Sequence, residues 1–242
     1  MTGQPLASTK GDHASLDLAR LLPTLLQQII WRGTARESSV ALTFDDGPHP
    51  IYTPQILEIL RHHQAPATFF PLGCNVERYP HLIREMFAQG HTIGNHSYGH
   101  GSLIFASRKR LRREMAATSA AIERIIGQRP HFFRPPRGLS GLATLQMASL
   151  LGMRTVLWTL SPRDWTRPGV GRIVARVLAK ARDGAIVLLH DAKYDDPGED
   201  RSQTVRALPE IIRGLRARGY RLVTLNELMS PRKTEQRREP EE

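Results

Sequence analysis

From Val40 onward, short runs of β-branched and aromatic residues alternate with stretches of helical periodicity. Apolar runs bounded by turn residues predict strands at residues 40–45, 67–72, 92–96, 132–135, 155–160, 185–190 and 221–225. Between them, apolar positions recur every three to four residues and predict helices at residues 53–63, 80–89, 108–126, 142–151, 170–181 and 204–218. This order is typical of parallel βα units.

Seven strands with six helices between them predict an α/β fold, a distorted (β/α) barrel rather than an open sheet. The 242 residues suffice for one such domain, which we place at residues 40–229. Residues 1–39 form an extension in which we expect an amphipathic helix, packed on the domain or lying on a membrane surface. The polar residues 230–242 are expected to be a disordered charged tail.

Polar and aromatic side chains recur where the predicted strands end. They are Asp45, Asp46, His96, Arg134, Arg137, Asp164, Trp165, His190 and Asp191. Any one of them is explained as readily by packing or by a structural ion pair. In an α/β barrel, however, the carboxyl ends of the strands meet at one rim, and its loops host the active site. Their recurrence in order therefore predicts a catalytic rim.

Two segments suggest a metal centre. Asp45 and Asp46 close the first strand before a Gly-Pro turn, and His96 and His100 follow about fifty residues on. One carboxylate and two histidines suit a divalent ion, zinc first, with cobalt, nickel or manganese as alternatives. Three protein ligands leave positions open for water and substrate, and Asp45 stays available for proton transfer. Taken separately, the acids also fit an ordinary turn and the histidines a solvated loop.

The net charge of +11 favours weak attraction to an anionic polymer or a membrane surface. The basic clusters at residues 108–113, 213–221 and 232–238 are more typical of solvated faces than of a specific nucleic-acid site. The single cysteine, Cys74, excludes an intramolecular disulfide. We see neither a standard secretory signal nor a bilayer-spanning run, which favours a cytoplasmic location without fixing the compartment. Nothing in the sequence indicates an oligomeric state.

In order along the chain, these segments resemble the five motifs of polysaccharide deacetylases of the NodB-homology type, carbohydrate esterase family four. The resemblance covers about residues 40–228. Thr43-Phe44-Asp45-Asp46-Gly47-Pro48 is similar to the first motif and implies Asp45 as catalytic base and Asp46 as metal ligand. His96-Ser97-Tyr98-Gly99-His100 is similar to the second and implies both histidines as metal ligands.

The fifth and fourth motifs are also present. Leu188-Leu189-His190-Asp191 resembles the fifth, which implies His190 as general acid and Leu188 as lining for the acetyl methyl group. Ser161-Pro162-Arg163-Asp164-Trp165 resembles the fourth, with Ser161 where the family often has an acid. The resemblance implies that Asp164 tunes His190 and that Trp165 forms a wall of the sugar groove.

Arg134-Pro135-Pro136-Arg137-Gly138 resembles the third motif but has Arg137 where the family usually has an aromatic residue. The resemblance implies that Arg134 orients Asp45 through a charge-assisted pair. It also implies that the backbone N–H of Arg137 serves as oxyanion donor, whatever its side chain. An arginine in place of the usual aromatic residue is expected to change the shape of the groove that receives the sugar.

The expected activity is metal-dependent removal of N-acetyl groups, or of O-acetyl groups, from an amino-sugar polymer or oligomer such as peptidoglycan or chitooligosaccharide. Two alternatives stay open. One is a metal amidase or deformylase acting on a non-polymeric or lipid-linked substrate. The other is a protein that binds an anionic polymer and retains a vestigial site. Substrates of the family usually lie outside the cytoplasm, which the start of this chain does not explain.

Overall fold

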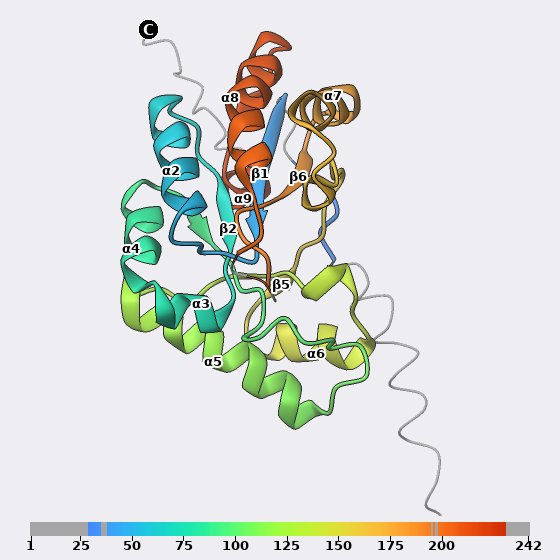
Figure 1. The fold of residues 1–242 in the computed structure, drawn as a ribbon. Helices are drawn as coiled ribbons and strands as arrows, with labels where there is room; N and C mark the ends of the chain where they lie inside the picture. The colour runs from blue at the N-terminus through green and yellow to red at the C-terminus, as the bar shows by residue number, and fades with distance from the viewer. Residues whose placement is uncertain (1–28, 35–37, 195, 197, 231–242) are drawn as a thin grey trace, which may run out of the picture.

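The computed structural model describes residues 29–34, 38–194, 196 and 198–230 (Figure 1). In these residues the strands are β1 (Ser39–Asp45), β2 (Thr68–Phe70), β3 (Thr92–Ile93), β4 (Phe132–Phe133), β5 (Arg154–Thr155), β6 (Ala185–His190) and β7 (Arg221–Leu222). All seven predicted strands are present. The helix expected in the extension and the charged tail fall on residues 1–28 and 231–242, outside the described residues. The domain limits stay a prediction.

The helices are α2 (Tyr52–His62), α3 (Gly73–Arg78), α4 (Pro80–Ala88), α5 (Arg108–Ile126), α6 (Leu142–Leu150), α7 (Val170–Lys180), α8 (Ser202–Ala217) and α9 (Leu225–Met229), with 3₁₀ turns η1 (Pro136–Gly138) and η2 (Asp164–Thr166). The six predicted helices are confirmed to within two residues at each end. The longest, α5, has clear end signals: the Ser107 side chain accepts from Arg110 N–H, and Gly127 ends the helix at φ 70°. The short helices α3 and α9 were not predicted.

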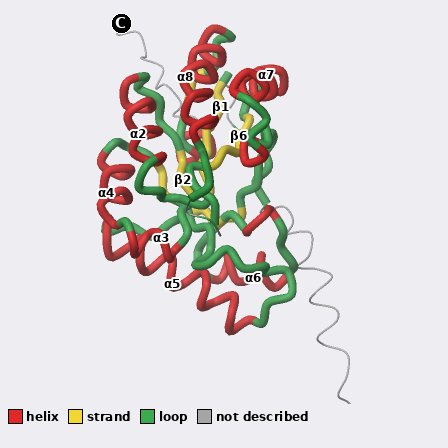
Figure 2. The backbone as a smooth tube through the Cα atoms, viewed as in Figure 1, coloured by secondary structure: helices red, strands yellow, loops and turns green. Residues whose placement is uncertain are grey.

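Parallel pairing connects the strands into two sheets, and helices lie outside them (Figure 2). β1 pairs with both β2 and β6, β2 with β3, and β4 with β5. Two single bridges link the two sheets: Asn95 with Phe133, and Leu160 with Val187. β7 pairs with the first two residues of β1. The expected α/β fold is confirmed, and its arrangement is consistent with a distorted (β/α) barrel in which single bridges, not continuous pairing, link the two sheets.

Most predicted strands were too long, because the chain leaves the ladder before it reaches the rim. The run at 92–96 pairs only as far as Ile93, and a Cβ at Gly94 would lie 2.5 Å from the Phe70 ring. The run at 221–225 ends because Thr224 begins α9. Its side chain accepts from Glu227 N–H while the Glu227 carboxylate accepts from Thr224 N–H, a capping box that was readable in the sequence.

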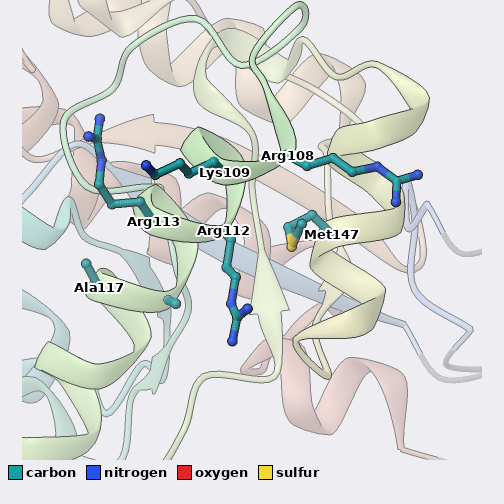
Figure 3. Close-up of a pocket in the computed structure, with 7 residues that line it drawn as sticks. Arg108, Lys109, Arg112, Arg113, Ala117 and Met147 are labelled. Atoms are coloured by element: carbon teal, nitrogen blue, oxygen red, sulfur yellow. The ribbon is translucent and has the colours of Figure 1, made fainter.

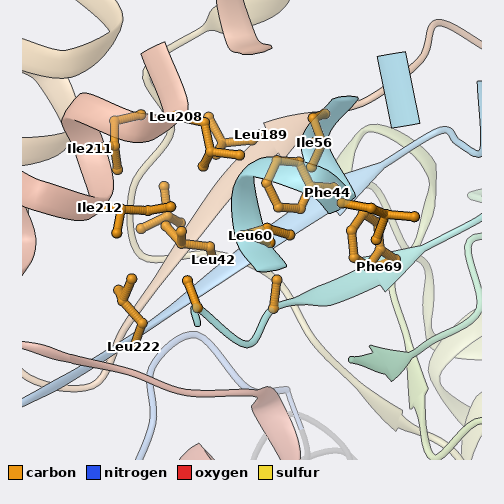
Figure 4. Close-up of a cluster of buried hydrophobic side chains, with 14 of the residues drawn as sticks. Leu42, Phe44, Ile56, Leu60, Phe69, Leu189, Leu208, Ile211, Ile212 and Leu222 are labelled. Carbon is orange, nitrogen blue, oxygen red and sulfur yellow. The ribbon is translucent and has the colours of Figure 1, made fainter. Parts of the chain in front are cut away.

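The two faces of β1 meet different surroundings. Val40, Leu42 and Phe44 belong to the main buried core, with side chains from α2, β6 and α8 (Figure 4). Because side chains alternate along a strand, Thr43 and Asp45 point to the opposite side, where both contact Arg134. The strand thus delivers an acid to the barrel interior at its carboxyl end.

The helices form the outer layer, with α7 packed on α8, α8 on α2, and α5 in contact with α3, α4 and α6 (Figure 1). This layer covers strands that are buried over most of their length. In the part of the chain that is described, no helix has the length and apolarity needed to traverse a membrane.

Candidate metal centre and active site

Asp46, His96 and His100 converge at the rim. One potential ligand atom from each lies within 4.8 Å of the others, and all three residues are buried. Asp46 Oδ1 is 3.4 Å from His96 Nε2 and 3.3 Å from His100 Nε2. In the described part of the chain, no other group of three or more His, Cys, Asp or Glu residues comes together in this way.

The state of these groups fits a divalent cation. Asp46 Oδ1 is buried without a hydrogen-bond partner, an arrangement that is costly unless a positive charge sits beside it. Burial by itself raises the pKa of Asp46, but the neighbouring His96, His190 and His100 outweigh burial and lower it to about 2. The pKa of His100 is lowered to about 4, chiefly by burial, so its imidazole is neutral and able to donate a lone pair.

A backbone oxygen on the side of the ring away from Asp46 fixes the orientation of His96. Its Nδ1 lies 2.8 Å from the backbone oxygen of Arg134. Because a carbonyl can only accept, Nδ1 carries the hydrogen, which leaves the lone pair on Nε2 directed at Asp46. This support is typical of metal-binding histidines. The residues present therefore fit a metal site.

Asp45 has a different environment from its neighbour Asp46. Its Oδ1 accepts from Arg134 Nη1 at 2.7 Å, and its Oδ2 is 3.7 Å from His96 Nε2. Arg134 is completely buried and also donates to Thr43 Oγ1 and to two backbone oxygens, those of Val156 and Leu157. Burial lowers the pKa of Arg134, which Asp45 opposes. The ion pair holds one oxygen of Asp45 and leaves the other facing the ligand triad.

His190 lies beside Asp45, because the two residues are paired across β1 and β6. Its Nδ1 is 3.0 Å from Asp164 Oδ1, and its backbone N–H donates to Asp164 Oδ2 at 2.8 Å. Thr204 Oγ1 donates to the same Oδ2 at 3.0 Å. Burial lowers the pKa of His190, but the charge and hydrogen bond of Asp164, followed by Asp46 and Asp45, raise it to about 9. His190 is therefore a proton donor at neutral pH.

Two exposed aromatic rings flank the site. The Trp165 ring is edge-on to His190, with centroids 5.2 Å apart, and the residue is 40% exposed. Tyr194 stacks on His100, with centroids 3.9 Å apart and planes at 20°, and is 37% exposed. Leu188 is buried two residues before His190, on the same face of β6. The two rings therefore lie directly against polar groups of the site.

Left-handed backbone marks the loops of the site. The non-glycine residues with positive φ are Asp46, Gln64, Ser97, His100, Arg137, Arg163 and Arg167. All except Gln64 belong to the loops that carry the site residues. Each such conformation costs roughly 1 kcal/mol or more and persists only where surrounding contacts impose it. Two of the three potential metal ligands, Asp46 at φ 76° and His100 at φ 57°, are held in this way.

Sequence reasoning missed the residues that shape these loops. Asn95 Oδ1 accepts from Ser97 N–H, while the Glu114 carboxylate accepts from the N–H groups of Tyr98 and Gly99. Glu114 could have been noticed because it is an acid on the inward-facing side of α5, a helix that begins with many basic residues. Tyr194, to which we assigned no role from the sequence, contacts the potential metal ligand His100.

Asp191, which we predicted at the rim without assigning it a role, is fixed by contacts inside the protein. It is buried, and its Oδ2 accepts from Thr53 Oγ1 at 2.6 Å. Burial raises its pKa to about 7. A Cβ at Gly47 would lie 2.0 Å from Asp191 Oδ2. The turn after Asp46 therefore requires glycine at this close approach.

A separate hollow of about 650 Å³ lies between α5 and α6 (Figure 3). Its lining consists of Arg108, Lys109, Arg112, Arg113, Ala116, Ala117 and Met147. None of the residues of the rim borders it, so it is not part of the candidate active site. The predicted attraction to an anionic polymer or membrane surface stays a prediction.

A barrel rim that combines a metal-ligand triad with an ion-paired acid and a carboxylate-bound histidine defines a metal-dependent hydrolase. The chain matches the family described as polysaccharide deacetylase over residues 32–156. It belongs to this family, whose members depend on a metal ion. The predicted family and hydrolase class are thus confirmed.

Similar proteins extend the match over most of the chain. A peptidoglycan-N-acetylglucosamine deacetylase of Bacillus cereus is 42% identical over 83% of this chain and 92% of its own length. A chitooligosaccharide deacetylase of Bradyrhizobium is 44% identical over 78% of this chain and 90% of its own. A solved peptidoglycan N-acetylglucosamine deacetylase, bound to an N-oxidanyl-benzamide, has a TM-score of 0.80 at 33% identity and covers 85% of this chain and 94% of its own.

Proposed function

We propose that this protein is a metal-dependent deacetylase that removes N-acetyl groups from an amino-sugar polymer or oligomer, such as peptidoglycan or chitooligosaccharide, and releases acetate. One observation carries the proposal. The ligand triad, the pair of Asp45 with Arg134, and the pair of His190 with Asp164 meet at a single rim. The activities named for the similar proteins supply the substrate class.

Asp46, His96 and His100 would hold the ion, for which zinc is our first choice and cobalt, nickel or manganese are alternatives. When bound, the ion would polarise the acetamido carbonyl and make water a stronger nucleophile. The backbone N–H of Arg137, in its left-handed turn, is our candidate for a hydrogen-bond donor to the oxygen that becomes negative.

Asp45 acts as general base. Its Oδ2 faces the triad and takes a proton from the attacking water, while Oδ1 stays paired with Arg134. That pairing keeps the carboxylate from turning away. Asp45 is therefore assigned to proton transfer and Asp46 to metal binding, although the two residues are neighbours in the chain.

His190 acts as general acid. Asp164 binds its Nδ1, so that Nε2 is the nitrogen left to give a proton to the departing amine. Asp46 contributes to the raised pKa of His190, so a cation that neutralises Asp46 would lower this pKa. Trp165 would form a wall for the sugar ring, and Leu188 would line the pocket for the acetyl methyl group.

The test is acetate release from N-acetylglucosamine oligomers by protein loaded with zinc or cobalt. We expect turnover that chelation abolishes and added metal restores, with the Asp45→Asn variant inactive under the same conditions. If metal-loaded protein releases no acetate from any acetylated glycan, the proposal is wrong. A parallel panel of small amides and formyl compounds tests the amidase alternative, which predicts faster turnover there than on glycans.

A further inference from the structure

The two histidines of the ligand triad are held in different ways. The ring of His96 is fixed through its Nδ1, which lies 2.8 Å from the backbone oxygen of Arg134. The ring of His100 lacks this support, because its Nδ1 is buried and has no hydrogen-bond partner among the described residues. Tyr194 stacks on the face of the His100 ring. Where His100 presents its Nε2 therefore depends on the backbone that carries it.

That backbone has an unfavourable conformation. His100 has φ 57° and Ser97, three residues earlier, has φ 67°, so both lie in the left-handed region. Residues other than glycine stay there only where surrounding contacts impose it. Within the loop of residues 97–100, the Ser97 side chain accepts from His100 N–H at 3.2 Å. The peptide groups between these two residues need partners from another part of the fold.

Glu114, on α5, is the partner of those peptide groups. One of its carboxylate oxygens, Oε2, accepts from Tyr98 N–H at 3.2 Å and from Gly99 N–H at 3.1 Å. The other oxygen, Oε1, is 3.9 Å from Arg113 Nη2. Glu114 is buried, and hydrogen bonds to an ionised carboxylate are stronger than those between neutral groups. A long helix thus holds the two peptide groups directly before His100.

We propose that Glu114 is a positioning residue for His100 and so sets the affinity of the triad for its metal ion. The inference rests on the proposed function and deepens it. Without the two hydrogen bonds from its peptide groups, the loop is free to leave the left-handed conformation. His100 Nε2, now 3.3 Å from Asp46 Oδ1, would then move away from the other ligands. Metal binding weakens although Asp46, His96 and His100 are all still present.

The test measures zinc affinity in the absence of substrate. Metal-free protein is titrated with zinc in competition with a chromophoric chelator, and circular dichroism verifies that each variant is folded. Glu114→Ala should bind zinc about tenfold to a hundredfold more weakly than the wild type, the loss typical of removing a group that orients a ligand. Glu123→Ala is the matched control and should bind like the wild type, because Glu123 is a more exposed acid on the same helix, paired with Arg129.

Two milder variants separate positioning from charge, and they decide the matter even where Glu114→Ala does not fold. Glu114→Gln loses the charge but keeps the side-chain length and an oxygen that can accept from both N–H groups. Glu114→Asp keeps the charge, but its side chain is one methylene shorter and leaves the carboxylate short of the loop. Positioning predicts that Glu114→Gln binds zinc more tightly than Glu114→Asp.

The inference is overturned if folded Glu114→Ala binds zinc as tightly as the wild type does. Tighter binding by Glu114→Asp than by Glu114→Gln would also overturn it, because the charge rather than the hydrogen bonds would then set the affinity. Absence of acetate release by the zinc-loaded wild type from every glycan contradicts the proposed function instead, and the zinc affinities still decide the role of Glu114.

Discussion

The buried part of this site, here called the floor, and its exposed part, here called the mouth, differ in the contacts that hold their residues. On the floor, Asp45, Arg134 and Asp164 are at most 3% exposed and are held by paired charges. At the mouth, Arg137 is exposed, and Trp165 and Tyr194 are 40% and 37% exposed on loops. The barrel register leaves the floor little freedom, whereas loops can change the mouth without disturbing it. We therefore expect chemistry to depend on the floor and substrate choice on the mouth.

The largest effect is expected for Asp45→Asn. An amide cannot take the proton from water, and loss of a general base lowers kcat by about a thousandfold. The variant keeps a similar shape beside Arg134, so its circular dichroism should match that of the wild type. The measurement is acetate release at saturating metal and substrate. A variant that retained a tenth of the wild-type rate would show that another group acts as the base.

Replacing an arginine should change the free energy of unfolding much more on the floor than at the mouth. Arg134→Met leaves Asp45 buried without its counter-charge and should lower the free energy of unfolding by about 3–5 kcal/mol. Arg137→Met removes an exposed side chain and should change it by no more than about 0.5 kcal/mol. Urea unfolding at pH 7 measures both. Equal effects at the two positions would remove the distinction between floor and mouth.

Asp164→Asn should move the pH dependence of turnover. A general acid must be protonated, so activity holds below the pKa of His190 and falls above it. Asp164 raises this pKa, and its removal lowers the pKa, so the basic limb of kcat/KM moves to lower pH. At pH 8 the rate should fall about tenfold relative to wild type. Asp183→Asn, at an exposed acid before β6, is the control and should leave the limb in place.

The smallest effect is expected at the mouth. Trp165→Ala removes an exposed ring beside His190 and should raise KM about threefold to tenfold while kcat changes little. Leu150→Ala, at an exposed apolar residue that ends α6, should change neither. A fall in kcat as large as that in Asp164→Asn would place Trp165 with the floor.

The floor could be predicted from the sequence because it depends on local patterns. An apolar run that stops at two acids predicts a buried strand with its acids at the rim, and the structure places Asp45 and Asp46 there. His96, Arg134 and His190 follow the same logic at other strand ends. Helix limits were equally readable, since caps and periodicity are local signals.

The mouth could not be predicted in the same way. The stacking of Tyr194 on His100 joins residues far apart in the sequence, and no local pattern announces it. The left-handed backbone of His100 and Arg137 is imposed by tertiary contacts rather than by residue type. The two single bridges that link the sheets also join residues far apart in the sequence. One local signal outside the mouth was missed: the capping box at Thr224, in a segment that we interpreted as strand.

The central claim is that two neighbouring acids have separate tasks, and the zinc content of two variants tests it most directly. After loading with zinc and dialysis, Asp45→Asn should retain one equivalent of zinc per chain, because Asp46, His96 and His100 are intact. Asp46→Asn should lose most of its zinc, because it lacks the carboxylate of the triad. Equal zinc in both variants, or loss in Asp45→Asn alone, would contradict the assignment.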